Sequence, residues 1–176
     1  MIRAIAIPLF CVLAIGHASA CSLVAFSQEF RLDRRGASRE RPPPPVEIAS
    51  LRFVPWISDS GSCDGVGWIV IELSTTQIGI SRLKQHGYIV RPVSGVNDTG
   101  LFPKYPLALI RHGDSRTRLF WGWTGITPNS DGYVKWELEL VPVSRAGKQG
   151  SPTPFCVSSN RSCPDQSKSE GDADGV

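Results

Sequence analysis

The sequence has few of the residues from which catalytic and metal sites are most often built. Its 176 residues include only three histidines, and His17 lies in the N-terminal apolar segment. No pair of cysteines or histidines has the spacing of a zinc site, and Cys156 and Cys163 stand too far apart for a zinc knuckle. A glycine-rich phosphate-binding loop is also missing. We therefore expect no metal, no cofactor and no enzymatic activity.

Dense positive charge is missing as well. The chain has 19 Lys and Arg residues against 16 Asp and Glu residues, which gives a formal net charge of +3. A nucleic-acid-binding surface needs a much denser cluster of basic residues than any segment here provides. The composition therefore argues against a nucleic-acid partner.

Long apolar runs are confined to the N-terminus. Arg3 precedes an apolar run over residues 4–16, and the small residues Ala18-Ser19-Ala20 follow. This run is shorter than the roughly 20 apolar residues of a membrane-spanning helix. A basic start, a short apolar core and small residues before a cleavage site are typical of a secretory signal peptide. We expect residues 1–20 to be a signal peptide and the mature protein to be exported, with no spanning helix.

The residue after this segment is Cys21, and Ala18-Ser19-Ala20-Cys21 resembles the bacterial lipobox. In that motif the cysteine is lipidated and becomes the mature N-terminus; Ala18 stands where leucine is most frequent. The resemblance implies a lipid anchor on Cys21 as the only attachment to a membrane. Ser22 in place of aspartate implies the outer membrane or periplasm. Because ordinary signal peptidase also accepts Ala-Ser-Ala, a soluble secreted protein is the alternative.

Two segments are too polar to predict a packed structure. Residues 31–41 mix basic and acidic side chains, and four prolines follow at 42–45. We expect residues 21–45 to form a flexible, proline-rich tether to the lipid anchor. The Ser-, Asp- and Gly-rich residues 159–176 are expected to be a disordered tail. The folded domain is thus predicted over residues 46–158.

Residues 46–158 have the pattern of an all-β domain. Apolar side chains alternate with polar ones at Val134, Trp136, Leu138 and Leu140, which is the period of a strand with one buried face. Short apolar runs separated by turn residues repeat this signal along the domain. Strands are expected at 46–54, 66–73, 87–93, 106–111, 117–123, 133–143 and 152–158, and a short helical turn competes at 74–86.

The segment from Trp136 to Pro152 resembles the last hairpin of bacterial fibronectin type III-like domains. Those domains often end in an alternating strand followed by Val-Asp-x-Ala-Gly-Asn; the equivalent stretch here is Val143-Ser144-Arg145-Ala146-Gly147-Lys148. The resemblance covers about residues 46–158 and extends to uncharacterised exported bacterial lipoproteins with such a domain. It implies a single seven-stranded antiparallel sandwich of the immunoglobulin or fibronectin III type. It supplies no catalytic residues.

Such a sandwich suggests a disulfide between Cys63 and the C-terminal cysteines. The second strand of an immunoglobulin-like sandwich begins at the end where the seventh finishes, and export favours the oxidised state. A bridge from Cys63 to Cys163 would close a loop worth about 4.7 kcal/mol, against roughly 2–3 kcal/mol for Cys156–Cys163. We therefore expect Cys63–Cys163, with Cys63–Cys156 second and Cys156–Cys163 third.

Two stretches carry candidate functional residues. His112-Gly113-Asp114-Ser115 contains the residue types of a hydrolase triad, but residues this close in sequence do not converge as triad partners do, which favours a hairpin turn. The second candidate is a basic and aromatic surface that would bind an anionic glycan or an envelope protein. It comprises Lys104, Arg111, Arg116, Arg118 and Trp123. The alternative, a core tryptophan beside solvated arginines, stays open.

These observations predict a non-enzymatic β-sandwich protein of the cell envelope with a binding or structural role. An envelope enzyme or enzyme inhibitor with a cryptic site is the alternative. A deep cleft containing a strongly perturbed titratable residue would favour that alternative.

Overall fold

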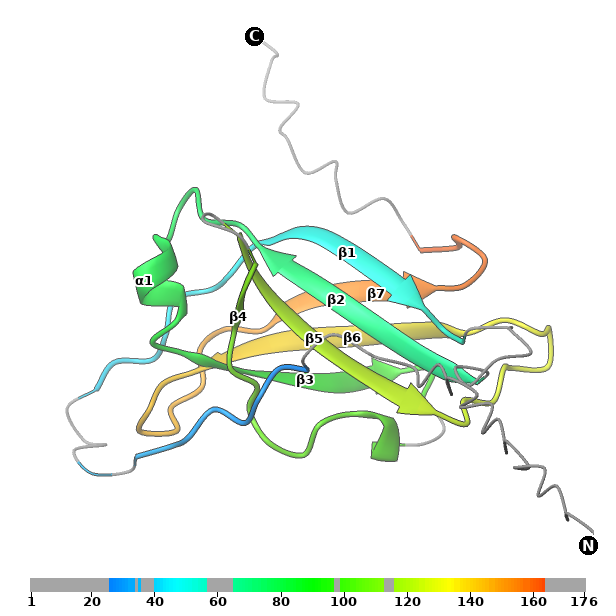
Figure 1. Ribbon diagram of the computed structural model, residues 1–176, viewed down its shortest axis with the longest axis horizontal. Helices are drawn as coiled ribbons and strands as arrows, with labels where there is room; N and C mark the ends of the chain where they lie inside the picture. Colours follow the sequence, from blue (N-terminus) through cyan, green and yellow to red (C-terminus); the bar gives the residue numbers. More distant parts are fainter. Residues whose placement is uncertain are drawn as a thin grey trace, which may run out of the picture.

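The computed structural model, drawn in Figure 1, describes residues 26–33, 35, 40–56, 65–96, 99–112 and 116–163. The predicted signal peptide, the proposed anchor residue Cys21, Cys63 and the chain beyond Cys163 lie outside these residues. All statements of structure below concern the described part.

The described chain is mostly β and forms two antiparallel sheets. One sheet has the strand order β1-β2-β5-β4 and the other β3-β6-β7. β4 has only three residues, so each sheet contains three long strands. The strands are β1 (Ile48–Val54), β2 (Val66–Leu73), β3 (Gly87–Ser94), β4 (Ile110–His112), β5 (Arg116–Thr124), β6 (Lys135–Val143) and β7 (Thr153–Ser158). A short helix α1 (Ile80–Leu83) precedes β3, and a 3₁₀ turn (Thr99–Leu101) follows it.

The two sheets lie face to face, and in the view of Figure 1 the β1-β2-β5-β4 sheet is in front. The prediction of a β-sandwich built from short strands is confirmed at this level. The strand expected at 106–111 is shorter than predicted, since β4 begins at Ile110 and Leu107 forms only isolated bridges to Glu29 and Tyr88. The helical turn that competed at 74–86 is present as α1.

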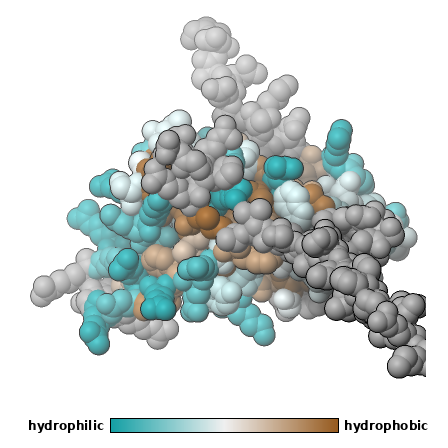
Figure 2. Space-filling model, in the orientation of Figure 1, coloured by the Kyte–Doolittle hydropathy of each residue, from teal (hydrophilic) through white to brown (hydrophobic). Residues whose placement is uncertain are grey.

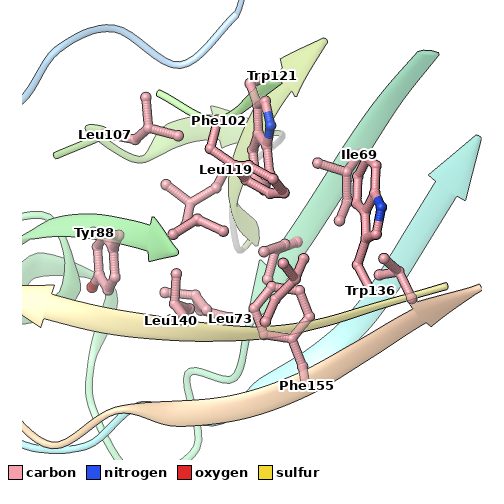
Figure 3. Packing of buried hydrophobic residues seen from close by; sticks show 14 of the residues in the cluster. Ile69, Leu73, Tyr88, Phe102, Leu107, Leu119, Trp121, Trp136, Leu140 and Phe155 are labelled. Atoms are coloured by element: carbon pink, nitrogen blue, oxygen red, sulfur yellow. The ribbon is translucent and has the colours of Figure 1, made fainter. Parts of the chain in front are cut away.

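The core lies between the sheets, and β6 has the inward face that its alternation predicts. Trp136, Leu138 and Leu140 are buried, whereas Glu137 between them is exposed. Figure 3 shows Leu119 of β5 projecting towards Leu140 of β6, and Trp121 of β5 lying beside Phe102. The Trp136 ring has three aromatic neighbours, whose centroids lie 5.2–5.4 Å away. They are Phe53, Phe102 and Trp123.

The N-terminal segment packs against the sandwich, although it was predicted to be a free tether. The Ser27 N–H donates to the Phe120 carbonyl oxygen at 2.8 Å, and the Phe30 N–H donates to Pro106 at 2.7 Å. Phe30 is buried against Gly87, where an added Cβ would lie 2.4 Å from its ring. This segment therefore follows the edge of β5 beyond β4, where unpaired strand groups need a partner.

Residues 40–46 also contact the domain. The Ala146 N–H donates to Glu40 Oε2 at 2.8 Å, and the Thr153 hydroxyl donates to the Val46 carbonyl oxygen at 2.6 Å. The Pro43 carbonyl lies so close to Gly150 that a Cβ there would be 2.3 Å from its oxygen. The prediction of a free tether is thus wrong for Glu40 and Pro43, whereas Val46 was predicted to belong to the domain. Although residues 31–41 are polar in composition, Asp33 and Glu40 are hydrogen-bonded to Arg145 and Ala146 of the domain.

Candidate functional site

A row of side chains crosses the outer face of the β1-β2-β5-β4 sheet. Phe120 of β5 lies at its centre, and the Phe26 ring stacks on it with centroids 5.1 Å apart and planes 22° apart. On the other side the Trp68 ring of β2 meets Phe120 edge-on at 6.2 Å. The guanidinium carbon of Arg52 on β1 lies 5.3 Å from the Trp68 ring centroid. We call Phe26, Phe120, Trp68 and Arg52 the outer row.

The local sequence explains why the row faces outward. Ile69, Ile71 and Leu73 are buried between the sheets, so the alternate positions of β2, including Trp68 and Val70, point away from the core. Val70 is the register partner of Phe120, and residues opposite each other in an antiparallel pair share a face. An antiparallel sheet with one face towards water usually carries polar side chains there. The central strands of this sheet depart from that pattern.

The row is only partly covered. Phe120 is 6% exposed because Phe26 lies over it, but Phe26 itself is 42% exposed. Figure 2 looks onto this face and shows hydrophobic residues in its middle part with hydrophilic residues around them. Arg118 of β5 and Glu72 of β2 are register partners on the same outer face, and the Ser50 hydroxyl donates to the Glu72 carboxylate at 2.9 Å.

A cleft of about 280 Å³ lies beside the outer row, where the N-terminal segment meets the connection before β4. Phe26 and Tyr105 both line it, and they are the two large aromatic side chains of the described chain that are most exposed, at 42% and 43%. Its other lining residues include Ser27, Trp121 and Gly122. The Trp121 indole N–H is buried without a hydrogen-bond partner among the described residues. The exposed aromatic surface therefore gathers at one side of the molecule.

The predicted basic and aromatic surface is only partly present. Trp123 points into the core, is 7% exposed, and donates its indole N–H to the Pro55 carbonyl oxygen at 3.0 Å. The prediction that it belongs to a binding surface is therefore wrong, because Trp123 shares the inward face of β5 with Trp121. Arg118 lies on the outer face of β5, and Lys104 is exposed next to Tyr105.

Arg111 and Arg116 are placed only through their backbones. They belong to the β4–β5 pair, where Arg111 is opposite Thr117 and Arg116 is opposite His112. The remaining residues of the triad-like stretch, 113–115, lie outside the described chain, so the hairpin turn expected there stays a prediction. The structure brings the basic residues to the β5 side of the molecule but does not join them to Trp123.

Sequence reasoning missed four residues of this surface: Phe26, Arg52, Trp68 and Tyr105. Trp68 could have been found, because three apolar residues at alternate positions after it already fill the inward face of β2. Phe26 could not, because its partner Phe120 lies far along the chain. No local pattern marks such a contact.

The described disulfide corrects the predicted pairing. Cys156 and Cys163 are bonded, with Cα atoms 5.6 Å apart and a sequence separation of 7. The pairings preferred from the sequence, Cys63–Cys163 and then Cys63–Cys156, are therefore wrong. β7 buries Phe155 and Val157, so Cys156 points away from the core.

A tight turn after β7 brings the second cysteine back. The backbone N–H of Ser162 donates to Asn160 Oδ1 at 3.1 Å, and Arg161 has a φ of 59°, in the left-handed region. The turn reverses the chain and returns Cys163 to the outer side of β7. Residues 159–163, which were predicted to begin a disordered tail, therefore form this turn, and the rest of the predicted tail lies outside the described residues.

Two ionisable side chains with shifted pKa values lie where α1 meets β3: His86 just before β3 and Tyr88 within it. Tyr88 is fully buried, donates its hydroxyl to the Leu83 carbonyl oxygen at 2.9 Å, and has its pKa raised by burial. Burial lowers the pKa of His86; the carboxylate of Glu40 opposes this shift and the guanidinium of Arg82 adds to it. Neither lines the cleft beside the outer row. Their contacts join α1 and the N-terminal segment to β3, which is a structural role.

The chain matches no protein-family model, no curated protein and no solved structure. Within the described ranges, no three His, Cys, Asp or Glu side chains are grouped so that they could hold a metal ion. The same part of the chain contains no helix that is both long and apolar enough to cross a membrane.

Proposed function

We propose that this protein is a non-enzymatic, lipid-anchored protein of the bacterial cell envelope that presents a binding surface on an immunoglobulin- or fibronectin III-like sandwich. The observation that carries the proposal is the outer row, an aromatic and cationic surface on a sheet face that an isolated sandwich would keep polar. Aromatic residues and arginine are enriched where proteins bind their partners.

The strand order supports the choice of sandwich. The constant-type immunoglobulin domain has strands A, B, E and D in one sheet and C, F and G in the other. With the seven strands lettered in chain order, β1-β2-β5-β4 facing β3-β6-β7 is the same arrangement. Domains of this architecture serve as spacers and binding modules, so the fold alone does not choose a partner.

The N-terminal packing supports the binding role. Phe26 is held on Phe120 at the edge of β5, so an exposed aromatic ring is presented at a fixed place on the fold. The outer row therefore has surface available for a partner in the envelope, and an envelope protein, an anionic glycan and the membrane itself are the candidates.

The anchor is tested by the change Cys21→Ser. A diacylglycerol anchor gives stable attachment where one acyl chain is marginal, so Cys21→Ser should move the protein from the membrane fraction to the soluble fraction. The double change Cys156→Ser/Cys163→Ser is the control, because it also removes cysteines but should leave the protein in the membrane fraction. Mass spectrometry of the wild-type N-terminus should find a lipidated Cys21. An unmodified Cys21 would refute the lipoprotein proposal.

A further inference from the structure

The proposed anchor lies five residues before the first ring of the outer row, since Cys21 precedes Phe26 by that number. Five residues span at most about 18 Å when fully extended, at roughly 3.3–3.6 Å per residue. Phe26 is fixed on Phe120 by ring stacking, and the next residue is hydrogen-bonded to the same strand at 2.8 Å. Only a short stretch of chain therefore separates the outer row from the proposed anchor.

The chemistry of the row suits the boundary between lipid and water. Aromatic rings with a polar group, such as those of tryptophan and tyrosine, concentrate at membrane interfaces, and arginine and lysine extend their charged ends towards the headgroups. Here Trp68 lies beside the Arg52 guanidinium, and exposed Tyr105 lines the same cleft as Phe26. Aromatic surface that is open to water in the free domain would be buried on docking.

The charge around the row complements an anionic surface. Arg52 and Arg118 lie on the outer face, and exposed Lys104 follows next to Tyr105. Glu72, a carboxylate on this face, accepts a hydrogen bond from Ser50 and is the register partner of Arg118. Basic side chains near a membrane surface strengthen binding to anionic lipids by about fivefold each.

We infer that the outer row and Tyr105 form a membrane-docking surface for anionic phospholipid headgroups. The sandwich then lies on the bilayer with its β1-β2-β5-β4 sheet towards the lipid, and does not extend from it on a long tether. The inference rests on the proposed anchor at Cys21 and adds a contact made by the protein's own side chains. A glycan or a protein on the same surface is the outcome that would replace it.

The test uses the exported Cys21→Ser protein, so that no acyl chain contributes to binding. Co-sedimentation should show binding to vesicles of phosphatidylglycerol mixed with phosphatidylcholine, and weaker binding to phosphatidylcholine alone. Adding Phe26→Ser should weaken binding to the mixed vesicles by about tenfold, because exposed apolar surface is lost. Adding Arg52→Glu should weaken it by at least about fivefold.

Val93→Ser is the matched control. Val93 is 62% exposed on β3, in the opposite sheet, so its replacement should leave vesicle binding unchanged. Tyr105→Ser provides a second change on the docking surface, at a side chain that is 43% exposed, should Phe26→Ser unfold the protein. Circular dichroism identifies an unfolded variant.

The vesicle assays either support or overturn the membrane-docking inference. Absence of vesicle binding, or equal losses for Tyr105→Ser and Val93→Ser, would overturn the inference. Retention on purified peptidoglycan or an anionic glycan without vesicle binding would assign the surface to a glycan and overturn it as well. An unmodified Cys21 in the wild type would refute the anchor separately; vesicle binding by the Cys21→Ser protein would then still support docking by side chains alone.

Discussion

The two faces of the β1-β2-β5-β4 sheet carry similar residues in different surroundings. On the inner face Trp123 is 7% exposed and its ring lies 5.2 Å from Trp136 of the opposite sheet. On the outer face Phe120 is covered by Phe26, which is itself 42% exposed. What lies opposite an aromatic side chain, and not its type, decides whether it serves as core or as accessible surface.

The difference has an energetic consequence. An inner residue loses contacts on all sides when it is truncated and leaves a cavity, whereas an outer residue loses part of one contact. Truncating large side chains on the inner face should therefore lower stability most, and changes on the outer row should affect binding more than stability.

The largest effect is expected for Trp136→Ala. Its ring contacts Phe53, Phe102 and Trp123, so its loss should lower the free energy of unfolding by about 3–5 kcal/mol. Glu137→Ala, at the next position of β6, removes an exposed carboxylate bonded to Ser94 and should cost less than about 0.5 kcal/mol. Urea melts measure both. Equal losses at the two positions would contradict the assignment of the inward face.

The Cys156–Cys163 disulfide, on the outer side of β7, should contribute more to stability than the outer row does. Replacing both Cys156 and Cys163 by serine opens a short loop and should lower the free energy of unfolding by about 2–3 kcal/mol. Urea melts without reductant measure the loss. Non-reducing peptide mapping of the wild type should recover the two cysteines in one linked pair, and a peptide that joins Cys63 to either of them would contradict the structure.

Phe26→Ala should have a smaller effect on stability. It removes a stacked aromatic pair but exposes only one further ring, so a loss of about 0.5–1.5 kcal/mol is expected. Leu32→Ala is the control in the same segment, because Leu32 is 39% exposed, and it should cost less than about 0.5 kcal/mol. A loss at Phe26 as large as that at Trp136 would mean that the outer row belongs to the core.

The smallest substitution, Thr117→Val, tests the inner face of the β1-β2-β5-β4 sheet. Thr117 is fully buried on β5, and its hydroxyl has no hydrogen-bond partner among the described residues. Replacing the hydroxyl by a methyl group of similar size should raise the free energy of unfolding by about 1 kcal/mol. Thr153→Val should lower it by a similar amount, because that hydroxyl donates to the Val46 carbonyl oxygen. Thermal melts that reverse the two signs would refute this reasoning.

Local patterns predicted most of the fold. The strand expected at 66–73 coincides with β2, and the inward face of β6 follows from its alternation, because each depends on neighbouring residues. The packing of the N-terminal segment depends on Ser27 and Phe120, which are 93 positions apart. From its composition alone, that segment was predicted to be a flexible tether.

Alternation along single strands contradicts two of the predictions, the surface position of Trp123 and the pairing of Cys156. Trp123 stands two positions after Trp121 on one strand, so both had to share a face, and the structure buries both. In β7 the same rule places Cys156 outward once Phe155 and Val157 face the core. Loop entropy favoured a longer disulfide loop, but it describes the unfolded chain and contains no information on the turn that returns Cys163 to β7.

The most direct test of the outer face is photo-cross-linking in native membranes. The photoreactive aromatic residue p-benzoylphenylalanine would replace Phe26 in one protein and Val93, on the opposite sheet, in another. Mass spectrometry after irradiation should find phospholipid attached at position 26 and none at position 93. Lipid at both positions, or only protein or glycan attached at position 26, would contradict a membrane-facing outer row.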